Sequence, residues 1–258
     1  MGNTKKIVMI TGATSGIGLA CAEIFAMHGY HLIITGRRKE RLHKISSSFP
    51  EKYKVSVLPL NFDIRNKNET EKALSQLPEK WKNIDILINN AGLARGFNLI
   101  QDGDTQDWDE MIDTNLKGLL YVSKFVIPLM IARQKGHIIN VGSIAGKEPY
   151  INGNVYCATK AAVDSLTRSM RIDLLKHNIK VTQIAPGATE TEFSLVRYRG
   201  NKDAARKTYE GFKPLKGKDI ASIILYAASL PPHVNINDMI ITPTAQANTV
   251  HTARKQQK

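Results

Sequence analysis

The fold is decided by a short stretch near the start of the sequence, Ile7-Val8-Met9-Ile10-Thr11-Gly12-Ala13-Thr14-Ser15-Gly16-Ile17-Gly18. Its apolar, β-branched beginning is typical of a buried strand, and its three glycines follow at the point where that strand ends. Apolar residues then recur at helical spacing as far as Phe25, and Gly29 stands where such a helix would stop. The stretch therefore predicts a strand, a tight glycine-rich turn and a helix.

The same alternation of strand and helix patterns continues along the chain. Because helical patterns separate the strand patterns, helices are expected to connect parallel strands. The sequence predicts an α/β fold, a doubly wound parallel sheet (Rossmann fold) of about seven strands with helices on both faces. The predicted strands are Ile7–Thr11, His31–Thr35, Val55–Leu60, Ile84–Asn89, His137–Val141, Lys180–Ala185 and Met239–Thr242.

Length and composition favour one domain. The chain has 258 residues, of which 42% are hydrophobic, so it can bury one sizeable core. It carries no internal repeat and no linker, and we expect a single domain over residues 1–258. The least regular stretch, residues 188–217, is polar and basic and follows the strand that ends at Ala185. Such a long excursion after the carboxyl end of a strand is a candidate substrate lid.

The formal net charge of +13 admits an anionic partner without identifying it. The basic residues, including those of the tail Arg254–Lys258, are not interleaved with aromatic residues as a base-stacking surface requires, so no nucleic-acid partner is predicted. The first apolar run is too short for a signal or spanning helix, so we predict no membrane partner and a cytoplasmic location. Neither the two cysteines, Cys21 and Cys157, nor the scattered histidines have metal-ligand spacing, and no metal site is predicted.

The glycine-rich turn is a candidate phosphate site. Glycines let the backbone approach a pyrophosphate, and the N-terminus of the following helix favours its charge through free N–H groups. The residues assigned to dinucleotide binding here are Gly12, Thr14, Ser15, Gly16, Ile17 and Gly18. The glycine spacing differs from the commoner dinucleotide pattern, and a structural connection between strand and helix is the alternative interpretation.

Two arginines follow the second predicted strand. A protein that prefers NAD usually places a carboxylate at this point to bind the ribose hydroxyl, but this sequence has Arg37 and Arg38. Two guanidiniums offer forked, charge-assisted hydrogen bonds to a 2′-phosphate, which favours NADP as the cofactor. The alternative is that both arginines open a solvated helix over residues 39–49.

Polar residues also follow the third and fourth predicted strands. Asp63 and Ile64 come after one strand, and Asn90, Ala91 and Gly92 come after the next. The carboxyl ends of parallel strands form the edge of an open sheet where ligands bind. We therefore count these residues as candidate cofactor contacts, although an Asn-Ala-Gly turn also occurs as an ordinary bent loop.

Tyr156 and Lys160 stand four residues apart in a helical pattern, so a helix places both on one face. A phenol has an ordinary pKa of about 10, and a neighbouring ammonium lowers that pKa by favouring the phenolate. Tyr156 is thus a candidate general acid and base that Lys160 activates. Ser143 follows a predicted strand and can hold a substrate oxygen. Each residue alone is commonplace, and the combination carries the prediction.

Taken together, the glycine-rich turn, Asn-Asn-Ala-Gly, Ser143 and the Tyr156-x-x-x-Lys160 pair resemble the short-chain dehydrogenase/reductase family from Ile7 to Thr244. The resemblance implies that Tyr156 is the general acid and base, that Ser143 positions the carbonyl, and that Lys160 tunes Tyr156 and binds the nicotinamide ribose. It also implies that Asn115 is a fourth catalytic residue, which helps to hold Lys160 and a relay water. Asp63 and Ile64 would contact the adenine and Asn90 the adjoining ribose. The residues expected to line the nicotinamide include Pro186, Gly187, Thr189 and Thr191.

Within that family, residues 191–200, 150–160 and 243–246 resemble the NADP-dependent 3-hydroxy acid dehydrogenase group. This group includes serine and allo-threonine dehydrogenases, malonic semialdehyde reductases and sulfoacetaldehyde reductases, and the resemblance implies oxidation of a hydroxyl beta to an acid group. A small acid needs a counter-charge, for which the candidates are Arg197 and, beside it, Arg199. A solvated loop charge is an equal alternative for Arg197. Lys147 and Glu148 depart from the group, which leaves the acid that is recognised open.

The resemblance also implies a homotetramer built around two long helices and the C-terminal strand. Two other functions stay open beside the 3-hydroxy acid dehydrogenase. One is an NADPH-dependent reductase of sulfoacetaldehyde or another small carbonyl. The other is a non-catalytic NADPH-binding protein, against which the presence of Ser143, Tyr156 and Lys160 argues.

Overall fold

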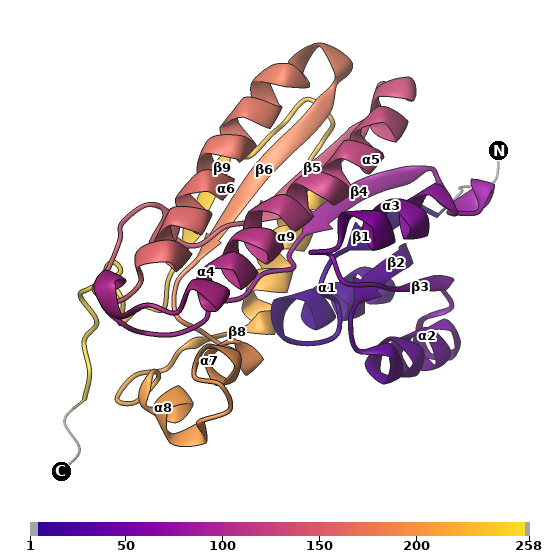
Figure 1. Cartoon of the computed structure of the whole chain (residues 1–258). Coiled ribbons are helices and arrows are strands. Elements are labelled where there is room, and N and C mark those ends of the chain that lie inside the picture. Colours follow the sequence, from indigo (N-terminus) through magenta and orange to yellow (C-terminus); the bar gives the residue numbers. More distant parts are fainter. Residues whose placement is uncertain (1–4, 256–258) are drawn as a thin grey trace.

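Figure 1 shows a computed structural model in which helices surround one twisted sheet; it describes residues 5–255. Seven parallel strands pair in the order β3-β2-β1-β4-β5-β6-β9, which confirms the predicted doubly wound sheet. The strands are β1 (Ile7–Ile10), β2 (His31–Gly36), β3 (Val57–Asn61), β4 (Ile84–Asn89), β5 (Gly136–Val141), β6 (Ile179–Pro186) and β9 (Asp238–Ile241). Every predicted strand is found. The ends of the expected domain and of the basic tail, residues 1–4 and 256–258, lie outside the described residues.

The sheet is buried on both faces, because successive side chains of each strand point to opposite sides. In β1, Val8 and Ile10 enter one apolar cluster, whereas Ile7 and Met9 enter the other. Helices α1, α2 and α9 cover the first face, and α3, α5 and α6 cover the second. These helices are α1 (Gly16–Met27), α2 (Lys39–Tyr53), α3 (Lys67–Ser75), α5 (Leu119–Ala132), α6 (Asn154–Asp173) and α9 (Gly217–Ser229).

Helix α4 (Thr105–Ile112) continues into α5 through a π-helical turn, η3 (Asp113–Gly118). A π turn inserts an extra residue into the helical ladder and often marks a functional position. The continuous helix Thr105–Ala132 is long and apolar enough to cross a membrane by length and composition alone. Since it packs on the sheet through Leu119, Val122 and Val126, we regard it as a core helix.

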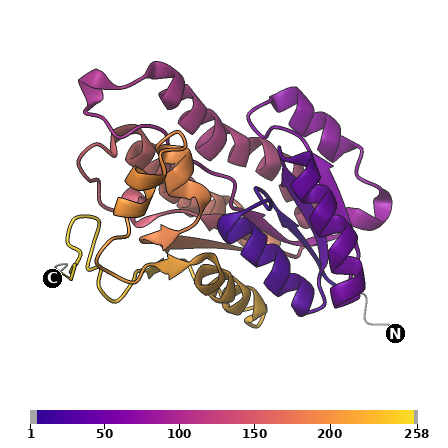
Figure 2. The same ribbon diagram turned by 90° about the horizontal axis from the view of Figure 1, so that it is seen from below.

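The predicted lid, residues 188–217, has more regular structure than expected. Two short helices, α7 (Glu192–Arg197) and α8 (Lys202–Lys207), lie between two short parallel strands, β7 (Thr189–Glu190) and β8 (Leu215–Lys216). Figures 1 and 2 show this part as a small lobe beside the C-terminal segment. Short 3₁₀ turns complete the chain as η1 (Glu79–Trp81), η2 (Ile100–Asp102), η4 (Ile144–Gly146) and η5 (Leu175–His177).

The strand order locates the site. The chain adds strands to one side of β1 up to β3 and then continues from β4 on the other side. The connections after β1 and β4 therefore diverge, and ligands of doubly wound proteins bind in the crevice that this leaves at the carboxyl ends of the strands.

Candidate active site

One cavity of about 740 Å³ opens at the carboxyl ends of the strands. Every residue predicted for the cofactor, for catalysis or for the substrate lines it, except Gly18, Asn115 and Arg199. The fold thus brings together residues from the glycine-rich turn, five further strand ends, α6 and α7.

The glycine-rich turn presents open backbone to this cavity. Gly12 and Gly16 have φ of +67° and +56°, in the left-handed region that favours glycine. A Cβ at Gly18 would collide with the Gly12 carbonyl oxygen and with Nδ2 of Asn90, so only glycine fits there. Helix α1 begins at Gly16 with no side-chain cap and no acidic residue in its first turn, which leaves its N–H groups available to an anion.

Asn90 braces this turn. Its Nδ2 donates to the carbonyl oxygens of Thr11 at 2.9 Å and Gly12 at 3.3 Å. The Thr11 hydroxyl in turn accepts from the backbone N–H groups of Asn90 and Ala91, each at 3.0 Å. The amide that we expected to contact a ribose therefore has its donors directed to the turn, and it fixes the turn against the end of β4.

The two arginines after β2 have different surroundings. All three guanidinium nitrogens of Arg38 donate to protein atoms: Nε to the Thr14 hydroxyl at 3.0 Å, Nη2 to the Ser15 hydroxyl at 2.6 Å and Nη1 to Glu192 at 2.6 Å. Arg37 is half exposed, and its Nη1 lies 3.8 Å from a carboxylate oxygen of Asp63. Arg37 is therefore the freer of the two to meet a phosphate.

Glu192 was not predicted from the sequence. It starts helix α7, and its two oxygens accept from Arg38 and from Nη1 of Arg41 at 2.7 Å. Thr191 caps the same helix by accepting from the N–H of Phe193 at 3.2 Å, and its side chain packs on Gly16. The start of α7 is thus tied to the glycine-rich turn. A lone glutamate after a strand gives no signal of such a contact in the sequence.

Asp63 is held by its neighbour in the chain. Nη2 of Arg65 donates to the Asp63 carboxylate at 2.6 Å and Nε at 3.0 Å. Burial raises the pKa of Asp63, but the hydrogen bonds and charge of Arg65 outweigh burial and hold that pKa below its ordinary value. Ile64 is buried and packs over Gly118 of the π turn.

Ser143, Tyr156 and Lys160 meet at the inner end of the cavity, and all three are buried. Lys160 Nζ donates to the carbonyl oxygen of Val141 at 2.9 Å, and burial lowers its pKa to about 8. Burial also raises the pKa of Tyr156 well above its ordinary value, and the Ser143 hydroxyl and the charge of Arg197 act in the opposite direction. The charge of Arg197 therefore favours the phenolate of Tyr156, and the expected effect of Lys160 on this pKa stays a prediction.

Asn115 lies in the π turn behind the cavity wall. Its Oδ1 accepts from the N–H of Leu93 at 2.8 Å, and its Nδ2 donates to the Leu93 carbonyl at 2.9 Å and the Thr159 hydroxyl at 3.0 Å. Gly92 has no side chain to separate Asn115 from Lys160, because a Cβ there would lie 3.2 Å from Oδ1 of Asn115 and 3.5 Å from Nζ of Lys160. The π turn therefore places Asn115 beside Gly92, which Lys160 also borders.

Arg197 points from α7 into the cavity and is largely buried among aromatic rings. Its Cζ lies 5.0 Å from the ring centre of Tyr156 and 5.6 to 5.7 Å from those of three others, and it donates to the Tyr150 hydroxyl at 2.5 Å. The other rings belong to Phe97, Tyr150 and Phe193. Within residues 5–255, Nε of Arg197 has no hydrogen-bond partner, and no carboxylate pairs with this guanidinium. Arg199 instead pairs with Asp107 at 2.8 Å and Asp104 at 3.0 Å.

The sheet, the glycine-rich turn and the Ser143–Tyr156–Lys160 cluster define a nucleotide-dependent dehydrogenase of the Rossmann class. Residues 6–200 match the family model described as short chain dehydrogenase. The chain is 44% identical over 242 residues to the NADP-dependent 3-hydroxy acid dehydrogenase YdfG of Salmonella typhi, which covers 93% of this chain and 96% of that protein. The chain belongs to the short-chain dehydrogenase/reductase family.

This chain is also similar to a sulfoacetaldehyde reductase and to a serine dehydrogenase. Sulfoacetaldehyde reductase 2 of Chromohalobacter salexigens is 44% identical over 244 residues, with 94% of this chain and 96% of that protein covered. The closed form of serine dehydrogenase complexed with NADP⁺ superposes with a TM-score of 0.91 at 41% identity, and the match covers 97% of this chain and 100% of that one.

Proposed function

We propose that this chain is an NADP-dependent oxidoreductase that interconverts a small 3-hydroxy acid and its semialdehyde or keto form. The relatives named above support the reaction class and the cofactor. One observation carries the choice of an acid: a largely buried arginine, Arg197, faces the cavity without a carboxylate partner in the described chain. A buried charge is costly unless it is paired, so an anionic substrate would complete this site.

The residues present fit NADP. The N-terminus of α1 and the glycine-rich turn would hold the pyrophosphate, and the collision of any Cβ at Gly18 with the turn shows how closely this backbone is packed. Arg37 would hold the 2′-phosphate, while Arg38 supports the turn through Thr14 and Ser15. Asp63, Ile64, Ala91 and the segment from Pro186 to Thr191 would line the remaining length of the cofactor. When bound, NADP supplies the hydride acceptor for oxidation, and NADPH supplies the donor for reduction.

The proposed catalytic residues transfer the hydroxyl proton of the substrate and bind its oxygen. In oxidation, the Tyr156 oxygen takes the hydroxyl proton of the substrate, and Ser143 donates a hydrogen bond to the same substrate oxygen. Lys160 and Asn115 both border Gly92, and this shared position supports a role for Lys160 in passing the proton on and for Asn115 in holding the lysine there. Reduction reverses each of these transfers.

Two alternative functions stay open. The first uses the same catalytic residues on another substrate, and the second is not catalytic. Arg197 would also bind a sulfonate, and the sulfoacetaldehyde reductase relative favours that substrate as the second candidate. A non-catalytic NADPH-binding protein is the alternative of another class. The expected cytoplasmic location and the absence of a metal, nucleic-acid or membrane partner stay predictions.

The substrate class is tested by following the absorbance of reduced nicotinamide with purified protein. NADP and NAD are each offered with L-serine, L-allo-threonine, 3-hydroxypropionate and 3-hydroxyisobutyrate, and NADPH is offered with sulfoacetaldehyde and with neutral carbonyls. We expect turnover of the acids with NADP. Turnover of neutral carbonyls alone would refute the acid assignment, and faster reduction of sulfoacetaldehyde would favour the second candidate.

The variant Tyr156→Phe tests whether this protein is an enzyme or a non-catalytic NADPH-binding protein. The substitution removes the hydroxyl that carries the proton and keeps the ring that packs on Phe193. We expect turnover to fall by about 10²- to 10⁴-fold while the affinity for NADPH stays within a few-fold. Unchanged turnover would refute the mechanism.

A further inference from the structure

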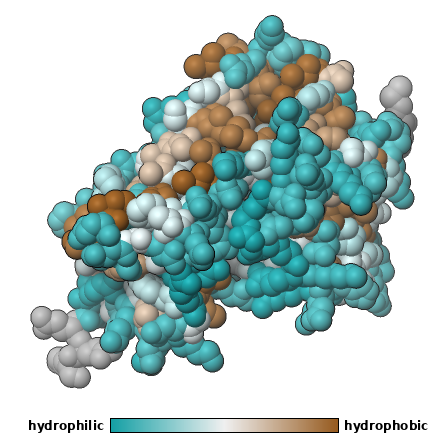
Figure 3. All heavy atoms as spheres, in the orientation of Figure 1, coloured by the Kyte–Doolittle hydropathy of each residue, from teal (hydrophilic) through white to brown (hydrophobic). Residues whose placement is uncertain are grey.

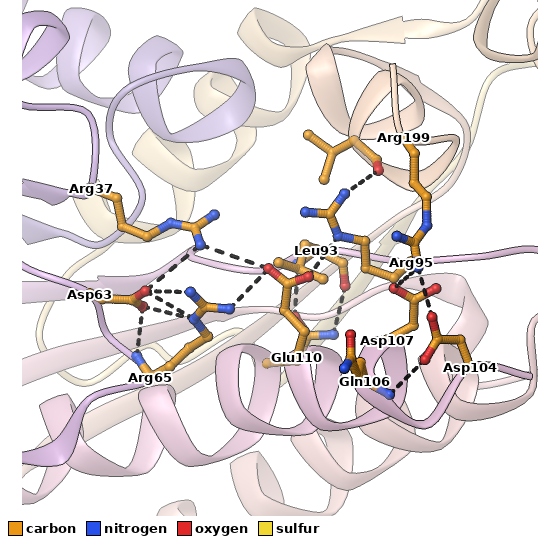
Figure 4. Close-up of polar contacts among 12 residues, drawn as sticks. Arg37, Asp63, Arg65, Leu93, Arg95, Asp104, Gln106, Asp107, Glu110 and Arg199 are labelled. Carbon is orange, nitrogen blue, oxygen red and sulfur yellow. Dashed lines mark hydrogen bonds and ion pairs between the residues drawn. The ribbon is translucent and has the colours of Figure 1, made fainter. Parts of the chain in front are cut away.

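The loop after β4 joins two elements that are distant in the sequence, α4 and α7. Nε of Arg95 donates to a carboxylate oxygen of Glu110 in α4 at 2.7 Å, and Nη1 donates to the carbonyl oxygen of Val196 in α7 at 2.9 Å. Both side chains are mostly buried, with Arg95 24% and Glu110 18% exposed. Figure 4 shows Arg95 between Glu110 and Arg199. A single guanidinium therefore holds the backbone of α7 to α4.

The same loop also contacts Arg197 directly. The N–H of Gly96 donates to the carbonyl oxygen of Arg197 at 3.2 Å, so Arg95 and Gly96 hold two successive carbonyls of α7. Helix α7 has only six residues, which is too short for a helix to be stable on its own. The direction of the Arg197 side chain must therefore depend on these tertiary contacts.

Glu110 is the carboxylate that anchors Arg95 to α4. Besides Arg95, it accepts from Nη1 of Arg65 at 3.0 Å and lies 3.8 Å from Nη1 of Arg37 (Figure 4). Burial raises the pKa of Glu110, but the hydrogen bond from Arg95 and the charges of Arg95, Arg65 and Arg37 outweigh it and keep that pKa below its ordinary value. Glu110 thus remains a carboxylate at neutral pH, and Arg95 keeps its anchor.

We propose that Arg95 and Glu110 are positioning residues that hold Arg197 in the cavity and thereby set the affinity for the acid group of the substrate. This inference rests on the proposed function, because Arg197 is the proposed acid ligand. Neither residue contacts the reacting atoms. Their effect is expected chiefly in the KM of acidic substrates, because Tyr156 and Ser143 are placed by α6 and by the end of β5. Arg197 also lies 5.0 Å from the Tyr156 ring, so its displacement would affect the proton transfer for every substrate alike.

The test compares Arg95→Met with a matched control, Arg133→Met. Arg133 is 25% exposed, pairs with Asp85 and donates to the backbone carbonyl of Ile84. Its replacement by Met therefore removes the same kinds of contact as Arg95→Met, but far from the lid. In Arg95→Met we expect the KM for the acid to rise by about tenfold or more, because misplacing a binding group by an ångström costs on the order of 10²-fold. The KM for a neutral ester of the same acid and the affinity for NADPH should change by less than about threefold, and any change in kcat should be the same for the acid and for the ester.

The conservative variant Arg95→Lys retains the charge but not the forked pair of donors, so it should restore the acid KM only in part. An unchanged acid KM in Arg95→Met, or an equal rise in Arg133→Met, would overturn the proposal. Amide hydrogen exchange of α7 in both variants distinguishes failure of the Arg95 proposal from failure of the proposed function. If the wild type turns over no acid, faster exchange of α7 in Arg95→Met alone supports the anchor, and equal exchange in both variants overturns it.

Discussion

Arg37 and Arg38 are adjacent, yet the fold gives them different tasks. The nitrogens of Arg38 are directed to Thr14, Ser15 and Glu192, whereas Arg37 lies at a looser 3.8 Å from its acidic neighbours. The sequence predicted two equivalent phosphate ligands, because it does not show which guanidinium a distant glutamate occupies. Glu192 lies 154 residues from Arg38, and only the fold brings them together.

Arg37→Ala is therefore expected to weaken NADPH binding by about 10- to 100-fold, the effect of losing a charged hydrogen bond of about 1.5 to 3 kcal/mol. The affinity for NADH, which lacks the 2′-phosphate, should stay within about threefold. Fluorescence titration with both nucleotides measures the two affinities. Equal losses for NADPH and NADH would show that Arg37 acts on the fold and does not read the phosphate.

The activity should depend on pH through Tyr156 and Lys160. Both groups are buried, and burial lowers the pKa of Lys160 to about 8 while it raises the pKa of Tyr156 above its ordinary value. Because Lys160 is proposed to pass the substrate proton on, oxidation needs its neutral amine, so the kcat/KM for oxidation should rise with pH and level off above about 8, while reduction should show the opposite trend. Initial rates between about pH 6 and 10 test this dependence, and a flat profile for both directions would contradict it.

At the scale of elements, the sequence predicted the strands, but it did not predict the helices of the lid. A buried strand such as β4 is indicated by its apolar residues Ile84 and Ile86 to Ile88, which only Asp85 interrupts, and its predicted bounds match. Helices α7 and α8 have six residues each, too few for a helical repeat to appear in the sequence. The π turn that places Asn115 was likewise invisible, because its residues continue the helical pattern of α4.

The contact between the glycine-rich turn and β4 can be tested with Gly18→Ala. The new Cβ would collide with the Gly12 carbonyl and with Asn90, at an expected cost of about 1 to 3 kcal/mol in the free energy of unfolding. The affinity for NADPH should fall as well. Gly29→Ala, at the other end of α1, is the control: nothing lies within 4 Å of its Cβ, although its φ of +80° strains any side chain. Urea unfolding and NADPH titration measure both effects, and equal NADPH affinities in the two variants would contradict this account.

For the whole molecule, we expect the homotetramer that the family resemblance implies. Apolar side chains gather on the surface over α5 and α6 (Figure 3), and Leu120 and Ile172 of these helices are exposed in the single chain. Strand β9 forms one edge of the sheet and exposes Ile240. An uncovered apolar edge strand favours association.

Light scattering should give a mass of about four chains, consistent with the closed symmetry of most homo-oligomers. Ile240→Asp should reduce that mass, because a charge on β9 would be buried in the interface. Met27→Asp changes an equally exposed apolar residue on α1 and should leave the mass unchanged. A monomeric wild type would contradict the expected assembly.

The most direct test of the proposed function compares kcat/KM for 3-hydroxypropionate and for its neutral methyl ester, with NADP, in the wild type and in Arg197→Met. If Arg197 binds the acid group, the wild type prefers the acid by about 10- to 100-fold, as expected for a charged hydrogen bond of 1.5 to 3 kcal/mol, and the variant loses that preference. Equal kcat/KM for the acid and the ester in the wild type would contradict the claim that this enzyme recognises an acid.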